Sequence, residues 1–267
     1  MPLTIGPNTP STGLTKARET VTKTLNQLSS GQRITRAADD AAAAAISEKL
    51  GAAERAFAQG QRNLSDGISL ARTAESSLSQ VSDLVSRMRE LTVQAGNGAL
   101  GDEARSAIQS EFDQLAEEVT RITEATEFNG QKLLNGDTSG AEAVTLRDGT
   151  GGNDVVQISI QDHSAQALSV EGRDVSDPST LDALDDALST ISSTRAELGS
   201  AENRLEAGIR NLETARENTA AANSRIRDAD FAQVAAELAA GQIMEQASVA
   251  TAVQSNIAAF TALELLR

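Results

Sequence analysis

The side chains that could carry chemistry in this sequence are few. The chain has 267 residues with no cysteine, and its single histidine, His163, lies in an irregular polar stretch. Zinc sites in proteins usually rely on histidine and cysteine, so a zinc site here would need carboxylates almost alone. His163 is expected to be a surface residue rather than a base or a ligand. The sequence predicts no catalytic residue, no metal site and no cofactor, and therefore no enzyme.

The acidic residues also lack an arrangement suited to catalysis. Three pairs are adjacent in sequence, namely Asp39-Asp40, Glu117-Glu118 and Asp185-Asp186. Adjacent side chains on a helix point in different directions, so each pair is expected to be a solvated face or a subunit contact. Residues 148–154, DGTGGND, match one copy of a calcium-binding glycine-aspartate repeat. Such sites need stacked repeats, and a plain turn is expected instead.

The composition favours long helices over a thick globular core. Aromatic residues make up 2% of the chain, with no Trp and no Tyr, so small aliphatic side chains must do the packing. The net charge of −15 argues against nucleic acid as a partner, because phosphate binding relies on basic residues. No apolar run suits a secretory signal peptide or a membrane span. Residues 1–36 carry +4 and residues 223–267 carry −2, so the two ends could attract each other.

The stretch that must organise such a fold is residues 61–95. Its apolar side chains recur every three or four residues, which places them on one face of a helix: Leu64, Ile68, Ala71, Ala74, Leu78, Val81, Val85 and Met88. This face needs other long helices beside it. A second stripe lies just downstream, at Ile108, Phe112, Leu115, Val119 and Ile122.

A third stripe, near the C-terminal end, is a heptad seam. It comprises Leu181, Leu184, Leu188, Ile191, Arg195, Leu198, Glu202, Leu205, Ile209 and Leu212. The fold expected is mainly α, a long antiparallel helical bundle or coiled-coil rod built from both halves of the chain. Arg195 and Glu202 interrupt the seam. They either pair with charges on neighbouring helices, or fix the register of the helices or mark a subunit contact.

Turn and capping signals divide the rest of the chain. Residues 96–101, GNGALG, predict a reversing turn, and residues 128–130, FNG, predict another. Strand-like alternation at 143–146 and 155–160 predicts a β-hairpin, in a middle region expected to form a loop at one end of the rod. Asp177 and Pro178 predict the N-cap and first residue of the long C-terminal helix.

Both ends of the chain are expected to be amphipathic helices that are weakly stable alone. Residues 1–13 contain prolines and glycines and should be irregular, and a narrow helix should follow from Leu14 to about Gly31. The apolar positions of the two ends are Leu14, Val21, Leu25 and Leu28, then Val249, Val253, Ile257, Phe260 and Leu263. The ends are predicted to pair with each other and with other copies, and head-to-tail contacts that do not close would give a filament.

Motifs at both ends of this sequence resemble bacterial flagellin. The N-terminal motifs are residues 28–34 (LSSGQRI), 38–42 (ADDAA), 62–70 (RNLSDGISL), 89–94 (RELTVQ) and 128–130 (FNG). The C-terminal motifs are residues 223–231 (NSRIRDADF) and 265–267 (LLR). Each motif is weak alone, but in this order and spacing, over residues 1–136 and 175–267, they are specific. The chain is similar to a short flagellin without large outer domains.

The resemblance implies a division of the chain and a set of partners. Residues 1–36 and 223–267 would form the inner tube of a filament, residues 37–136 and 175–222 a surrounding rod, and residues 137–174 a short variable region. The subunit would leave the cell unfolded through the flagellar type III channel and reside in the extracellular flagellum used for swimming. Expected partners are other flagellin subunits, an export chaperone at the C-terminal segment, and hook-junction and filament-cap proteins.

The resemblance also implies a surface for the vertebrate Toll-like receptor that senses flagellin. The matching positions are Arg87, Leu91, Gln94 and Glu111, and the alternative is that they serve only subunit contacts. Two other classes stay open as alternatives to the filament subunit. A hook-filament junction protein shares several of these motifs and would form a short ring. A coiled-coil adaptor or adhesin would form a soluble oligomer with ordered ends.

Overall fold

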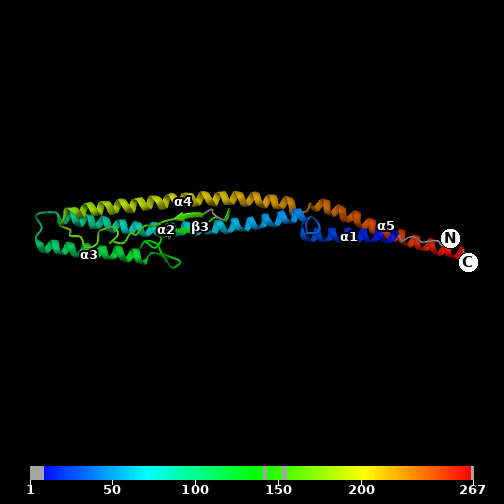
Figure 1. Ribbon diagram of the computed structural model, residues 1–267, viewed down its shortest axis with the longest axis horizontal. Coiled ribbons are helices and arrows are strands. Elements are labelled where there is room, and N and C mark those ends of the chain that lie inside the picture. Colours follow the sequence, from blue (N-terminus) through cyan, green and yellow to red (C-terminus); the bar gives the residue numbers. More distant parts are fainter. Residues whose placement is uncertain (1–8, 141–142, 152–154, 266–267) are drawn as a thin grey trace. The chain divides into compact units, whose positions relative to one another are not determined.

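The computed structural model describes residues 9–140, 143–151 and 155–265 (Figure 1). The helices in this part of the chain are α1 (Thr9–Ser30), α2 (Ala41–Ala95), α3 (Asp102–Ala125), α4 (Pro178–Arg227) and α5 (Phe231–Leu265). The strands are β1 (Glu127–Phe128), β2 (Gln131–Lys132), β3 (Val144–Arg147) and β4 (Val155–Ile158). The predicted mainly α fold with a small β-hairpin is confirmed.

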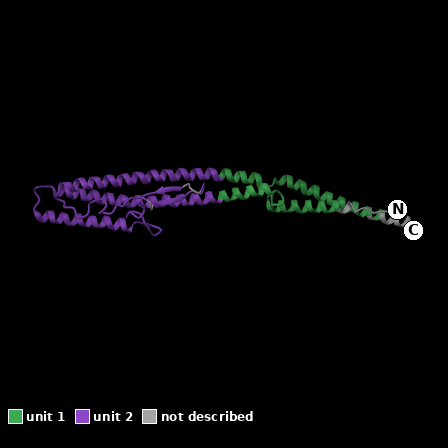
Figure 2. Cartoon of the chain, in the orientation of Figure 1, with its two compact units in different colours: residues 1–54, 217–267 green, residues 55–216 purple. Residues whose placement is uncertain are grey.

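The chain forms two compact units (Figure 2). Unit 1 comprises residues 1–54 and 217–267, and unit 2 comprises residues 55–216. Each unit therefore combines segments that are distant in sequence. The finer division into five segments stays a prediction.

The core of unit 2 lies between α2, α3 and α4. Ion pairs between α2 and α4 join Arg72 to Glu202 and Arg89 to Asp185, so the two helices run antiparallel. Of the predicted core positions, the structure buries Leu64, Leu78, Val81, Ile108, Phe112, Leu184, Ile191 and Leu205. The others, Ile68, Leu115, Leu188 and Ile209, are partly buried and pack against the same cluster. The three stripes thus meet in one apolar core.

The two charged residues of the α4 seam pair with α2. The Arg195 guanidinium lies 3.6 Å from a Glu75 carboxylate oxygen, and the Glu202 carboxylate lies 3.5 Å from Arg72. Arg195 Nε and Glu202 Oε1 are nevertheless buried without a hydrogen-bond partner. The interpretation that these residues pair with charges on a neighbouring helix is confirmed. Each residue keeps one polar atom that no hydrogen bond satisfies.

The middle of the chain packs more deeply than predicted. It contributes buried side chains from irregular backbone to the core of unit 2: Leu133, Leu134, Ile160, Ala165, Leu168, Val170 and Val175. The expectation that residues 137–174 form a loop at one end of the helices was wrong for Ile160, Ala165, Leu168 and Val170, because they belong to this core. His163 was also misplaced, because its side chain is fully buried rather than on the surface. Isolated apolar residues in irregular backbone carry no periodicity, so the sequence pattern did not show them.

The β3–β4 hairpin lies directly on α2. The strands are antiparallel and pair Val144 with Ile158, and the Asn63 amide on α2 donates to the Arg147 carbonyl at 2.9 Å. A Cβ atom at Gly60 would stand 1.7 Å from the Asp148 carbonyl oxygen, and one at Gly67 would stand 2.1 Å from Leu146 Cδ1. The glycines of α2 therefore create the space in which the hairpin lies. Residues 152–154 of the DGTGGND turn fall outside the described residues.

Local signals determine most helix ends. The Asp177 carboxylate accepts from the Ser179 amide at 2.9 Å, and α4 begins at Pro178 as predicted. This hydrogen bond lowers the pKa of Asp177. The Asn129–Gly130 turn joins β1 to β2, with positive φ at both residues. The prediction for residues 9–13 was wrong, because α1 begins at Thr9; proline is compatible with the first turn of a helix.

Candidate assembly surface

Helices α1 and α5 lie side by side in unit 1 (Figure 1). The least exposed residues of α5 recur with alternating steps of four and three, which marks one face of the helix: Val234, Leu238, Gly241, Glu245, Ser248, Ala252 and Ser255. On this face Arg18 pairs with Glu245 at 3.1 Å. A Cβ atom at Gly241 would lie 3.1 Å from Val21 Cγ2. The face against α1 is therefore narrow and mostly small or polar.

The face of α1 that lies against α5 also buries few large apolar side chains. Ala17, Thr24 and Gln27 are buried, whereas the predicted contact residues Leu14, Val21 and Leu28 are partly buried. Leu25 is 48% exposed. Leu25 was predicted to pair either with the other end of the chain or with other copies, and its exposure leaves only the second of these as a prediction. Leu25 remains available to another molecule.

A second face of α5 carries larger apolar side chains, all of them exposed. It alternates steps of three and four, and we name it the outer seam: Ala236, Ala239, Ile243, Gln246, Ala250, Val253 and Ile257. Ile243 is 66% exposed, and Val253 and Ile257 are each 53% exposed. A heptad pattern of this kind marks a helix face that packs on another helix. Because the inner face already contacts α1, the outer seam needs a partner from outside the described chain.

Two further predicted positions on α5 have no described side chains. The predicted stripe began at Val249, which is 41% exposed, and continued through Val253 and Ile257. Phe260 and Leu263 lie outside the residues whose side chains are described. The exposed part of the stripe overlaps the outer seam, so it does not serve the contact with α1.

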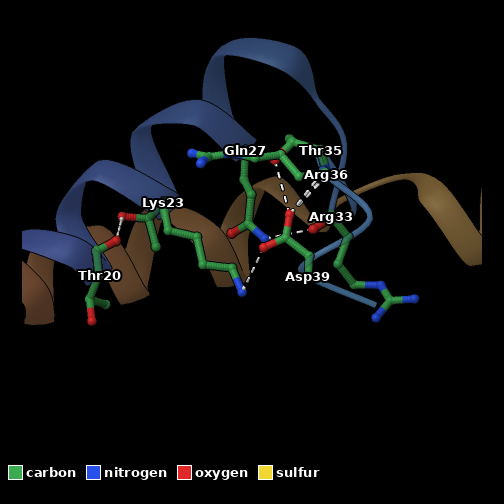
Figure 3. Close-up of polar contacts among 8 residues, drawn as sticks. Thr20, Lys23, Gln27, Arg33, Thr35, Arg36 and Asp39 are labelled. Carbon is green, nitrogen blue, oxygen red and sulfur yellow. Dashed lines mark hydrogen bonds and ion pairs between the residues drawn. The ribbon is translucent and has the colours of Figure 1, made fainter. Parts of the chain in front are cut away.

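The segment after α1 folds around Asp39 (Figure 3). Its carboxylate accepts from the amides of Thr35 and Arg36 at 3.2 and 3.1 Å and from the Thr35 hydroxyl at 3.1 Å. Lys23 of α1 lies 3.3 Å from the other carboxylate oxygen. Burial raises the pKa of Asp39, but these hydrogen bonds together outweigh it and lower that pKa. The next residue, Asp40, accepts from the Ala43 amide at 2.9 Å and caps α2.

Backbone hydrogen bonds connect this segment to the α4–α5 junction. The Arg33 amide donates to the Arg227 carbonyl at 2.7 Å, and the Ala229 amide donates to the Gly31 carbonyl at 3.0 Å. Between them, Gln32 and Asp228 form an antiparallel bridge. Gly31 has φ of 68°, which favours glycine after a helix. The segment after α1 is thereby joined to the α4–α5 junction through residues 31–33 and 227–229. No local sequence pattern predicts this pairing.

Two grooves flank α1. One, of about 690 Å³, is lined by α1 and by Arg36, Ala38 and Asp39. The other, of about 730 Å³, lies between α1 and α5 and includes Glu237, Met244 and Ser248. Each groove mixes apolar and charged side chains.

Comparison with known proteins agrees with this geometry. Residues 7–139 match the family described as the bacterial flagellin N-terminal helical region. Residues 181–266 match the bacterial flagellin C-terminal helical region. The chain belongs to the flagellin family. It is 43% identical over 251 residues to the flagellin of Halalkalibacterium halodurans, covering 92% of this chain and 91% of that protein.

Other relatives and solved structures agree with the family assignment. The Bacillus subtilis flagellin is 37% identical over 280 residues, with 92% of each chain covered. The crystal structure of Bacillus cereus flagellin is 29% identical and covers 57% of this chain and 88% of its own, with a TM-score of 0.50. A putative flagellar hook-associated protein from Vibrio parahaemolyticus shares the fold at 17% identity, with a TM-score of 0.59 over 71% of this chain and all of its own.

Membership of the flagellin family decides the general function. Flagellins are structural subunits of the flagellar filament and not enzymes, so this chain is a component of that filament. No described helix combines the length and apolarity needed to cross a membrane. Among the described residues, no group of three or more histidine, cysteine or acidic side chains could hold a metal ion.

The positions expected to face an immune receptor are not all on the surface of this flagellin family member. Arg87 bonds Glu111 at 2.9 Å and Glu90 at 3.0 Å, and these side chains are about half exposed or more. Gln94 is also exposed. Leu91 is 1% exposed and belongs to the core cluster. Its expected place on a receptor surface was wrong, because its side chain points into unit 2.

Proposed function

We propose that the chain polymerises through α1 and α5 into an open, head-to-tail flagellar filament that supports swimming. The outer seam carries this proposal: it is apolar and regularly spaced, and the α1 of the same chain does not cover it. Exposed apolar patches of this kind mark interaction sites. The opposite face of α5 already lies against α1, so the outer seam would be covered by neighbouring copies in an assembly.

The α1–α5 pair is suited to folding as it assembles. Its inner faces bury only alanine, valine and polar side chains in the described part of unit 1, so it gains little hydrophobic free energy as a monomer. Contact with neighbouring copies would bury Ile243, Val253 and Ile257 as well. Assembly would then provide the free energy that orders the pair.

The test compares two aspartate substitutions on α5. Val253→Asp places a charge on the outer seam, and Thr251→Asp places the same charge on an exposed position outside both faces. Seeded polymerisation of full-length protein is followed by light scattering and electron microscopy. We expect Val253→Asp to abolish filaments and Thr251→Asp to retain them, while both monomers keep the wild-type circular dichroism and thermal unfolding.

Filaments formed by Val253→Asp at the wild-type rate would refute the role of the outer seam. Short rings in place of long filaments from the wild-type chain would favour the junction-protein alternative. A stable, soluble oligomer with ordered ends would favour an adaptor.

Export in an unfolded state through the flagellar type III channel is a second part of the proposal. With no cysteine, the chain needs no disulfide to be broken before it is threaded. A chaperone would cover the apolar faces of α5 before export, and junction and cap proteins would meet the same end helices. Secretion of the wild-type chain from a strain that lacks a functional type III export gate would contradict this route.

Recognition by the flagellin-sensing Toll-like receptor stays a proposal. The proposed receptor surface now comprises the exposed residues Arg87, Gln94 and Glu111, and it omits Leu91 because that side chain is buried. A receptor-reporter assay with wild-type monomer should respond, and Arg87→Ala should lower the response about tenfold or more, as loss of an interface arginine often does. The paired control is Arg121→Ala, because Arg121 is an exposed arginine of α3 that also pairs with a glutamate.

A further inference from the structure

The only histidine of the chain is buried in unit 2 at the centre of an irregular layer. Residues 158–175 contribute Ile160, Leu168 and Val170 to the core, although they form no helix. His163 lies among them with no exposed surface. The role described above for the end helices does not use this residue.

His163 connects its segment to two other parts of unit 2. Its amide donates to the Leu134 carbonyl at 2.9 Å. Its ring Nε2 lies 3.0 Å from the Thr194 hydroxyl oxygen on α4. The same segment is joined to α3 because the Gln109 side chain bonds both the Arg173 carbonyl and the Val175 amide, at 2.8 and 2.9 Å.

The hydrogen bonds assign a neutral tautomer to the ring. Nδ1 lies 2.7 Å from the Gln161 carbonyl oxygen, which can only accept, so Nδ1 carries the hydrogen. Nε2 of the neutral ring is then an acceptor for the Thr194 hydroxyl. Both ring nitrogens are satisfied without a charge.

Protonation would keep these contacts but bury a cation. The Thr194 oxygen also lies 3.1 Å from the Thr190 carbonyl, so the hydroxyl hydrogen can turn there and leave its oxygen to accept from a protonated Nε2. What protonation adds is a charge in an apolar layer, and an isolated buried charge is strongly unfavourable. Opening the layer to water relieves that cost.

Few charged groups would stabilise a protonated ring. The carboxylates nearest in sequence to its contacts are Asp162 beside the ring, Asp137 near Leu134 and Glu197 near Thr194 on α4. The cation of Arg195, next to Thr194, pairs with Glu75. Burial lowers the pKa of His163, while the hydrogen bond to Gln161 and the Asp162 carboxylate raise it by less. The net direction is downward, which favours the neutral ring.

We propose that His163 is an acid-sensitive latch: it holds residues 158–175 on α4 while its ring is neutral and releases them when the ring is protonated. The sign follows from linkage. The pKa of His163 is 6.5 in the unfolded chain and lower in the folded one. The neutral ring therefore stabilises the fold fully above pH 6.5, and this stabilisation is lost as the pH falls below 6.5. The inference concerns unit 2 and is independent of how the ends assemble.

The experiment uses full-length monomer, in which a single histidine gives a single imidazole Cε1–H resonance. We expect its titration midpoint below 6.5. Between pH 7.5 and pH 5, amide exchange of residues 158–175, corrected for intrinsic rates, should rise by more than about twofold, because protonation of His163 removes the stabilisation that the neutral ring provides. Exchange in residues 191–205 of α4 should change less than about twofold, because those amides stay within the helix.

Variants separate the latch from general acid unfolding. His163→Gln should remove the pH dependence of exchange in residues 158–175. Thr194→Val should lower the midpoint further, because a protonated Nε2 would have no acceptor. Thr190→Val is the matched control, since the Thr190 hydroxyl is exposed and bonds the Asp186 carbonyl, and it should leave the midpoint unchanged.

A midpoint at or above 6.5, or full protection of residues 158–175 at pH 5, would overturn the proposal. So would the same pH dependence in His163→Gln. If that variant fails to fold, the wild-type titration and the Thr194→Val shift decide the matter by themselves.

Discussion

The two units place their large apolar side chains in opposite ways. In the described part of unit 2, side chains such as Phe112, Leu78 and Leu205 are fully buried, and Val93 and Val155 are its exposed large apolar residues. Among the residues of unit 1 whose side chains the structure describes, the buried apolar ones are Ala17, Ile34 and Val234, while eight large apolar side chains are exposed: Leu25, Ile46, Phe231, Ile243, Met244, Val249, Val253 and Ile257.

Charge follows the same division. Unit 2 contains 14 basic and 27 acidic residues, a net charge of −13, whereas unit 1 contains nine and eleven, a net charge of −2. A strongly charged exterior favours a soluble surface, and a nearly neutral apolar one favours association. Unit 2 thus completes its core within one chain, and under the proposed assembly unit 1 would complete its core with other copies.

The largest effect is expected from truncating one apolar side chain in each unit. Phe112→Ala should lower the free energy of unfolding of the monomer by about 3–5 kcal/mol, because it leaves a cavity in a filled core. Val253→Ala should change it by less than about 0.5 kcal/mol, as an exposed substitution does, yet slow assembly. Urea unfolding with seeded polymerisation measures both. Equal losses of monomer stability would break the comparison.

A smaller effect is expected where the hairpin meets α2. Gly60→Ala would drive a methyl group into the Asp148 carbonyl and should lower the stability of unit 2 by about 1–3 kcal/mol through overpacking. Gly199 of α4 is the matched control, since a Cβ there meets no atom within 4 Å. Gly199→Ala should stabilise by about 0.5–1 kcal/mol through helix propensity. Thermal unfolding distinguishes the signs, and stabilisation by Gly60→Ala would show that the hairpin is not fixed there.

The charged seam residues should matter less. Replacing Arg195 and Glu202 together with leucine removes two buried, unsatisfied polar atoms along with two ion pairs. Such replacements are often neutral or stabilising, so we expect a change in unfolding free energy within about 1 kcal/mol. Electron microscopy of the filaments then tests the register hypothesis. An unchanged filament would count against a role in register.

The smallest effect is expected at Asp39 in unit 1. Its pKa is lowered in the folded state, so the carboxylate stabilises the 31–40 segment above pH 3.8, the ordinary value, and this stabilisation is lost as the pH falls below it. Asp39→Asn should cost about 1 kcal/mol or less. Amide exchange at Thr35 and Arg36 should increase in the variant at pH 7. Unchanged exchange would show that Asp39 does not hold the segment.

Periodicity made the helices of unit 2 predictable, and local chemistry made their ends predictable. The stripes from Leu64 to Met88 and from Leu181 to Leu212 required burial, and Asp177-Pro178 is a cap with a defined mechanism. The irregular layer was not predictable, because Leu133, Leu168 and His163 follow no period. His163 was misjudged for the same reason: nothing in its neighbours indicates a core environment.

The face of α5 that contacts α1 could not be predicted either. The sequence contained the apolar residues of α5 and their spacing, but α5 is apolar around most of its circumference, so periodicity could not tell which face meets α1.

By itself the sequence determined the long helices, their capped ends and the membership of the flagellin family, because these depend on local periodicity and on ordered motifs. Only the tertiary structure decided that Gly241 and Ser248 face α1 while Ile243 and Val253 stay exposed. It also decided that residues 31–33 pair with residues 227–229 and that His163 is buried. Each of these depends on which distant segments meet, and that choice is made by packing over the whole chain rather than by any local pattern.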